Sequence, residues 1–131
     1  MRIFAFDALI QNPDRKFNNP NLGSHDEDLF IFDHELAFSF LLSVLPNLTP
    51  WVLTTEDYLE QHVFARVLKG EAFPEDFLSR LSRFSQEIAS VLSNQIPNEW
   101  KSDDLRKIEA HLTLMSEHVA EFAEEVTRRL A

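Results

Sequence analysis

Three polar side chains between positions 14 and 33 are of types that handle phosphate groups. Asp14 and Asn19 lie five positions apart, and Asp33 directly follows a short apolar run. Mg²⁺ prefers hard oxygen ligands, which one carboxylate and one amide carbonyl from opposite sides can supply. A second carboxylate can accept a hydrogen bond from an attacking hydroxyl and orient it. This set of residue types could therefore support phosphoryl transfer.

The spacing alone is a weak signal. Asp-x4-Asn is the spacing of the kinase catalytic loop, H-R-D-x-x-x-x-N, but it also arises by chance in many proteins. Residues 11–27 are rich in Asn, Pro, Asp, Gly and Ser, which are the usual residues of turns. On spacing alone, a loop with a purely structural role is the better interpretation.

A longer string of residues carries a family resemblance. The string runs Asp7-x4-Asn12-x-Asp14-Arg15-x3-Asn19-x-Asn21-Leu22 and continues as Ile31-Phe32-Asp33-His34-Glu35-Leu36-Ala37-Phe38. It resembles the active-site segment of HipA-like kinases and, more distantly, that of type II phosphatidylinositol 4-kinases. Residues 62–63 and 88–100 resemble the C-terminal helices of the same HipA-like group more loosely. The resemblance covers most of the chain, and its specific motifs lie within residues 7–38.

The resemblance implies a role for each main site residue. Asp14 would be the catalytic Asp that orients or deprotonates the acceptor hydroxyl. Asn19 and Asp33 would be the Mg²⁺ ligands and so would help to bind the cofactor. Arg15 would either structure the loop or face a phosphate as a cation.

Supporting roles would fall to the residues around this loop. Asn12 and Asn21 would brace it, and Asp7 would hydrogen-bond its backbone. His34 stands where protein kinases carry the Phe of D-F-G. The resemblance also implies Mg²⁺ and ATP as cofactors, neither bound tightly by this chain alone, and a protein Ser/Thr or another hydroxyl as the acceptor.

The chain lacks the sequence signals of a nucleotide-covering lobe. In the family an N-terminal lobe roofs the ATP site and carries a phosphate-covering loop and a Lys. Only thirteen positions precede Asp14, and none of them is Gly or Lys. Gly23 and Gly70 are the only glycines, too few for a Walker or dinucleotide loop. We therefore expect this chain to be the C-terminal lobe alone, whether as a truncated product, through a late start codon or as an evolved remnant. We expect it to be inactive until an N-terminal lobe completes it.

Two non-enzymatic hypotheses stand beside this one. The first is a helical module derived from a kinase lobe that keeps the loop for structure and binds or regulates a protein. The second is an acidic helical decoy or regulatory protein unrelated to kinases. A homo-oligomer is a further possible partnership.

Composition limits the class of protein. The chain has 131 residues, 44% of them hydrophobic, which predicts one folded domain. Its net charge of −10 argues against nucleic-acid or anionic-membrane binding. Residues 1–23 carry +1, so an anionic ligand is least disfavoured there. No secretory leader or spanning segment is visible, and the absence of cysteine fits a reducing cytoplasm.

The pattern predicts a mostly α-helical, kinase-like C-terminal lobe with a short β-strand or hairpin next to the catalytic loop. The first half should hold a helix at 2–10, a loop at 11–27, a buried strand at 29–32 and a buried helix from 36 to near Pro46. A helix at 56–69 should follow, capped by Thr55 and ended by Gly70. The next helix should be opened by Pro74 and broken by Pro97, and the last should run from the cap Ser102 to Leu130.

The predicted C-terminal helices carry apolar stripes and two histidines. Apolar residues recur at helical spacing within 77–91 and within 105–130, so the two stripes are expected to pack together, with a homodimer seam as the alternative. His111 and His118 are seven positions apart instead of the four that suit a metal pair on a helix. We expect both histidines to be solvent-exposed.

Overall fold

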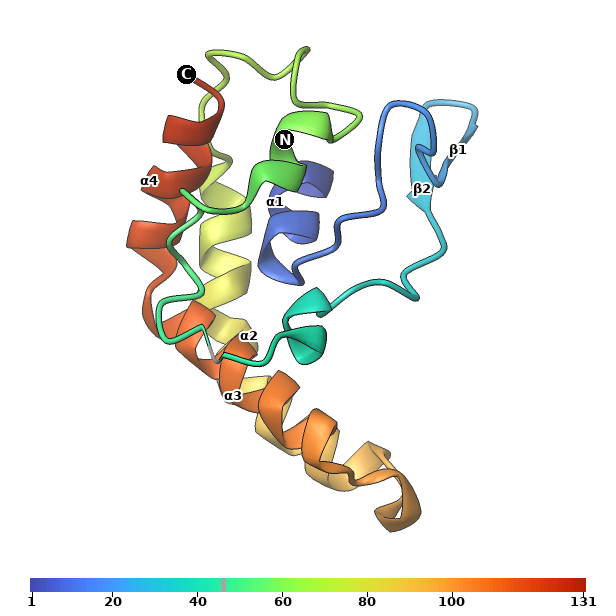
Figure 1. The fold of residues 1–131 in the computed structure, drawn as a ribbon, viewed down its shortest axis with the longest axis vertical. Coiled ribbons are helices and arrows are strands. Elements are labelled where there is room, and N and C mark those ends of the chain that lie inside the picture. Colours follow the sequence, from blue (N-terminus) through green and yellow to red (C-terminus); the bar gives the residue numbers. More distant parts are fainter. Residues whose placement is uncertain (46) are drawn as a thin grey trace.

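The computed structural model describes residues 1–45 and 47–131, without the side chains of residues 85, 86, 89, 90 and 93. Its regular elements are α1 (Arg2–Leu9), β1 (Leu22–His25), β2 (Asp28–Ile31), α2 (Glu75–Gln95), α3 (Asp103–Glu117) and α4 (Val119–Arg129), with 3₁₀ turns at η1 (Ser39–Leu42), η2 (Asp57–Gln61) and η3 (Asn98–Trp100). The fold is therefore mostly helical with one small antiparallel hairpin, as predicted (Figure 1).

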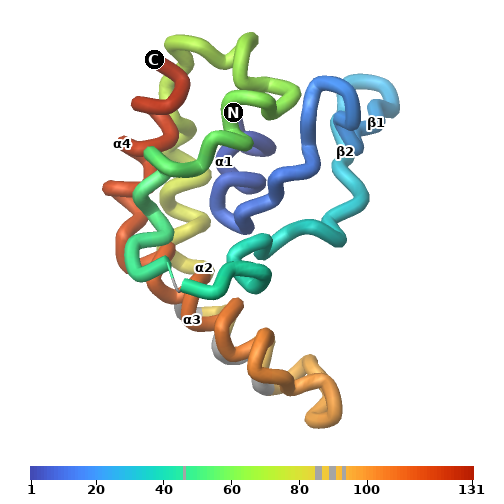
Figure 2. Tube along the Cα trace, viewed as in Figure 1, coloured from blue at the N-terminus to red at the C-terminus, as the bar shows by residue number. Residues whose placement is uncertain are grey.

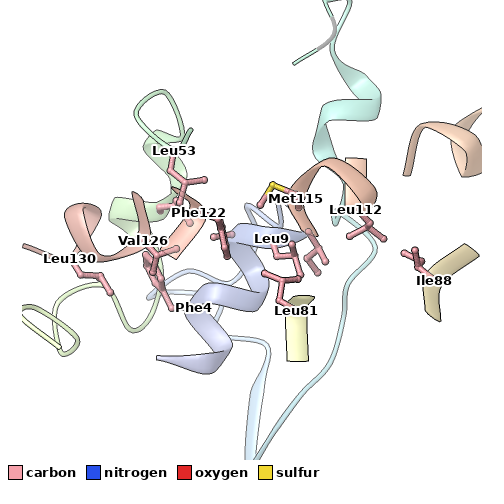
Figure 3. Packing of buried hydrophobic residues seen from close by; sticks show 13 residues of the cluster. Phe4, Leu9, Leu53, Leu81, Ile88, Leu112, Met115, Phe122, Val126 and Leu130 are labelled. Atoms are coloured by element: carbon pink, nitrogen blue, oxygen red, sulfur yellow. The ribbon is translucent and has the colours of Figure 1, made fainter. Parts of the chain in front are cut away.

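One apolar core joins the first helix to the last three (Figure 3). It draws Phe4 and Leu9 from α1, and the remaining labelled members are Leu53, Leu81, Ile88, Leu112, Met115, Phe122, Val126 and Leu130. The two predicted stripes thus share one core, which confirms that they pack together within the chain. Ser102 caps α3 as expected, because its hydroxyl accepts a hydrogen bond from the Leu105 N–H at 3.2 Å.

The predicted positions of the first helix and of the strand after it are correct, but the end of the helix and the surroundings of the strand differ from the prediction. Helix α1 ends at Leu9, one residue before the predicted end. The apolar run at 29–32 does form a strand, but it pairs with β1, inside the segment predicted to be loop, and lies largely exposed. The prediction of burial is wrong because, in the part of the chain that the structure describes, β1 is the single strand paired with β2. Gly23 faces Phe30 across the ladder, and a Cβ at position 23 would lie 2.1 Å from the Phe30 ring.

The buried helix predicted from residue 36 does not form. Within residues 36–45 only the short turn η1 is helical, and Val44 is 97% exposed. The N–H groups of Phe38 and Ser39 instead donate to the carbonyls of Ile10 and Gln11, at 2.6 and 3.3 Å. These bonds hold Phe38 at a φ of 58°, a conformation that a bulky residue rarely adopts and that interrupts a helix. The predicted end at Pro46 lies outside the described residues.

The helix predicted at 56–69 is also wrong. The chain forms the 3₁₀ turn η2, entered through Glu56 and not capped by Thr55, and then irregular turns. The backbone after this turn pairs with the loop of residues 12–21, which we call the Asp14 loop. The Phe17 N–H donates to the Gln61 carbonyl at 3.3 Å, and the Val63 N–H donates to the Arg15 carbonyl at 3.1 Å. Backbone groups engaged in this pairing are not available for an α-helical ladder.

The last predicted helix is divided. Helices α3 and α4 meet at His118, whose φ of −117° and ψ of 38° leave the helical region. The His118 ring stacks on Trp51, with the ring centroids 3.6 Å apart. The histidine at the junction is half-buried and not solvent-exposed as predicted.

The prediction that His111 is solvent-exposed is also wrong. Its ring is buried, with 6% exposure, and Nε2 lies 2.7 Å from the Leu9 carbonyl oxygen, to which it donates. The ring also stacks on Phe40, with a centroid separation of 4.6 Å. A polar group from α3 thus satisfies a carbonyl in the last turn of α1, which otherwise lacks an intrahelical partner.

We expect His111 to make stability depend on pH. Burial lowers the pKa of His111 below its ordinary value of 6.5 and outweighs the Leu9 hydrogen bond, which raises it. The unfolded chain therefore takes up the proton first as the pH falls below 6.5, and the folded state loses stability. His111→Gln keeps an N–H donor but does not titrate, so its deficit in unfolding free energy relative to wild type should shrink as the pH falls. A deficit independent of pH, measured by urea denaturation, would contradict this.

Candidate functional site

A buried carboxylate lies at the base of the Asp14 loop. Asp7, on α1, has no exposed surface, and its oxygens accept hydrogen bonds from three side chains. Asn12 Nδ2 lies 2.9 Å from Oδ1, and Arg15 Nε and His62 Nε2 lie 2.6 and 3.0 Å from Oδ2. One carboxylate therefore ties together α1, the loop and a segment 55 positions further along the chain.

Arg15 is buried and uses all five of its N–H donors. Besides Asp7, which it contacts through Nε and Nη2, it donates to the carbonyls of Pro20 and Asn21 and to His34 Nε2 at 3.0 Å. A guanidinium only donates, so Nε2 of His34 must accept. With 1% of Arg15 exposed, this geometry fits loop structuring better than a phosphate-facing cation.

The charges in this network are fixed by their partners. Burial by itself would raise the pKa of Asp7, but the hydrogen bonds from His62, Arg15 and Asn12 outweigh it and lower the pKa. The His62 Nδ1 accepts the N–H of Phe64 at 3.1 Å, so Nε2 carries the ring proton and donates it to Asp7. The network thus combines one carboxylate, one guanidinium and a neutral imidazole.

Asp14 lies at the surface side of the loop, half-buried. Its Oδ2 accepts the amide N–H groups of Asn19 and Asn21 at 2.9 and 3.0 Å, and its own backbone N–H donates to Asn12 Oδ1 at 3.2 Å. Asn12 and Asn21 therefore brace the loop, as expected. The structure brings Asp14 and Asn19 into direct contact and holds the carboxylate in one orientation.

Asp33 reaches the same region by a separate route. The Phe32 N–H donates to the Asn21 carbonyl at 3.2 Å, which joins the end of the hairpin to the Asp14 loop. Asp33 follows at a φ of 56°, exposed, and its carboxylate contacts no donor within residues 1–45 and 47–131. Its neighbour His34 points back to Arg15. The three predicted residues thus come from one loop and the adjoining strand end.

The donor types present are suited to a hard cation. Asn19 donates through Nδ2 to Asp14, so its Oδ1 remains an acceptor with no donor among the described residues. Together with the Asp33 carboxylate, it offers the amide and carboxylate oxygens that Mg²⁺ takes. In the part of the chain that the structure describes, no three His, Cys, Asp or Glu side chains gather closely enough to hold a metal ion. A cation here would therefore depend on the Asn19 amide and on water or phosphate oxygens.

His62 was not among the predicted site residues, and the predicted role of Asp7 is wrong. Asp7 was predicted to bond the loop backbone, whereas its carboxylate binds the three side chains named above. His62 stood out only as part of a loose resemblance, because no local pattern marks a histidine that pairs across 55 positions. Gln61 to Val63 pair with the Asp14 loop, and this pairing brings the ring to Asp7.

Comparison with known proteins identifies the class to which this fold and loop belong. The family model described as HipA-like kinase matches residues 1–129. The chain therefore belongs to the HipA-like kinase family. No curated protein and no solved structure matched it. Among the described residues, no helix has the length and apolar character needed to cross a bilayer.

Proposed function

We propose that this chain is the C-terminal lobe of a HipA-like kinase and contributes the catalytic half of a phosphoryl-transfer site. The observation that carries the proposal is the placement of Asp14. Its half-buried carboxylate is held by two Asn amides on a loop that a buried Asp–Arg pair anchors to α1. A carboxylate fixed in this way can accept a hydrogen bond from an acceptor hydroxyl and align its oxygen for attack.

Asn19 and Asp33 would hold Mg²⁺ through Oδ1 and the carboxylate. When bound, the ion would neutralise charge on transferring phosphate oxygens. Asn19 would act twice, because its amide nitrogen orients Asp14 while its carbonyl oxygen faces the metal ion. Arg15, with every donor used inside the protein, would position the loop and not contact phosphate.

The nucleotide would need a second lobe. Gly70 has a φ of 78° but belongs to the turn before α2, and Gly23 lies beneath Phe30, so neither builds a backbone cradle for phosphates. ATP would therefore bind tightly only when another lobe covers it. We expect the chain alone to transfer no phosphate, and the acceptor would be a protein Ser/Thr or another hydroxyl.

Metal binding tests the proposal on the chain as it stands. Mn²⁺ replaces Mg²⁺ at oxygen sites and broadens the NMR signals of nearby amides. We expect selective broadening around Asn19 and Asp33, lost in Asp33→Asn and in Asn19→Ala at Mn²⁺ concentrations that saturate wild type. Asp28→Asn, an exposed carboxylate in the same hairpin, is the matched control and should leave the broadening unchanged.

The outcomes separate the kinase lobe from the alternatives. Broadening that persists in both variants, or that centres elsewhere, would contradict the metal assignment and favour a non-enzymatic, protein-binding helical module. Robust ATP hydrolysis by the purified chain, lost in Asp14→Ala and Asp33→Ala, would overturn the requirement for a second lobe.

A further inference from the structure

An apolar groove lies between α1, the end of β2 and the first half of α2. It encloses about 360 Å³ and is lined mainly by aromatic and aliphatic side chains, including Phe6 and Phe77. Two guanidinium groups also line it. Arg2 is paired with Asp76 at 2.7 Å, whereas Arg80 forms no salt bridge or hydrogen bond with the described residues. The groove is therefore suited to an apolar side chain that has a carboxylate beside it.

The chain itself carries such a pair of residues at a distant point. The C-terminal end of α2 and the N-terminal end of α3, joined by η3, form a hairpin tip that projects beyond the rest of the molecule (Figures 1 and 2). Trp100 on this tip is 73% exposed. Glu99 precedes it and forms no salt bridge within the described part of the chain. Tryptophan is among the residues that most often anchor protein interfaces, because it buries a large apolar area in one pocket.

Half-exposed apolar residues connect the groove to the tip. Phe84 lines the groove, and Val91 lies two turns further along the same face of α2; they are 37% and 42% exposed. From Leu81 to the end of α2 at Gln95 the helix axis advances about 21 Å. The tip therefore lies too far along α2 to reach the groove of its own chain, but it can reach that of a neighbour.

We propose that two copies of this chain associate with their α2 helices antiparallel about a two-fold axis. In this arrangement Trp100 enters the groove of the partner subunit, and Glu99 approaches Arg80 of the partner subunit. The axis crosses α2 midway between the groove and the tip, so the tip-to-groove contact forms twice and the interface closes on itself. Phe84 and Val91 lie along the seam between the two contacts. The proposal does not depend on the phosphoryl-transfer function.

Analytical ultracentrifugation of the full chain across a wide concentration range tests the proposal. We expect a reversible dimer. A dimer of the Trp100→Ala variant loses two Trp100 anchors, one in each groove. Each loss should raise the dissociation constant by about thirtyfold. Arg80→Glu and Glu99→Arg should each weaken the dimer, and the double variant Arg80→Glu/Glu99→Arg should restore it, because the attraction is then re-formed with the signs exchanged.

The controls use exposed positions, so the variants should keep the helical circular dichroism of the wild type. Arg66→Glu reverses an exposed charge that lies over Phe17, outside the groove, and should leave the dissociation constant unchanged. A chain that stays monomeric throughout would overturn the proposal and leave the groove to a different protein. A dimer weakened equally by Arg66→Glu, or not restored by the double exchange, would also overturn it.

Discussion

Asp7→Asn is expected to lower the free energy of unfolding by about 3–5 kcal/mol, because it removes the charge that compensates a buried guanidinium. Arg15 Nε lies 2.6 Å from Asp7 Oδ2, and neither side chain has exposed surface. The Asn side chain has nearly the same shape, but it presents N–H groups where Arg15 and His62 also present donors. The loss should therefore exceed that of an ordinary surface substitution several times over.

Urea denaturation followed by circular dichroism measures this loss. Asp76→Asn is the matched control, since Asp76 also pairs with an arginine, at 2.7 Å, but both partners are exposed. Solvent screens that pair, so no clear change in stability is expected. Equal losses in the two variants would show that burial does not determine how much the Asp7–Arg15 pair contributes to the free energy of unfolding. For wild type, the lowered pKa of Asp7 further predicts that this stabilisation is lost as the pH falls below its ordinary value of 3.8.

Asp14→Asn should have the opposite profile, with little change in stability and a large loss of activity. Under the proposed function, we expect phosphoryl transfer to fall by about 10²- to 10⁴-fold, the usual contribution of a positioned acid–base group. The Asn side chain retains an oxygen for the amides of Asn19 and Asn21, so the loop keeps its shape. What disappears is the negative charge that attracts and orients the acceptor hydroxyl.

The measurement uses a longer polypeptide in which this chain follows a nucleotide-covering lobe, with transfer of labelled phosphate as the readout. Asp28→Asn, exposed at the start of β2, should retain full activity. Near-normal transfer by Asp14→Asn would remove this residue from the proposed mechanism. A loss accompanied by unfolding would instead assign Asp14 to the structure of the loop.

The parts predicted correctly from sequence are those set by local patterns. The positions of α1 and α2, the Ser102 cap and the packing of the 77–91 stripe against 105–130 follow from helical periodicity and capping chemistry. The family was also predicted correctly, because the order of residues within 7–38 matches a family pattern, and the family model matching residues 1–129 confirms it.

The failures lie where tertiary contacts override local preference. The segments at 36–45 and 56–69 are short, and isolated short helices are only marginally stable. Their backbone groups gain more from binding the end of α1 and the Asp14 loop, through Phe38 and Val63. A single run of apolar residues likewise could not reveal that β2 would have one neighbouring strand and remain exposed.

The sequence by itself determined the family, the helical character of the chain and the residue types of the loop, since these are properties of order and spacing. Only the tertiary structure decided what those residues contact. It placed His62 against Asp7, enclosed Arg15 completely and left Asp14 at the surface. The physical reason is that a buried charge must find its partners wherever the fold brings them, and such partners carry no mark in the local sequence.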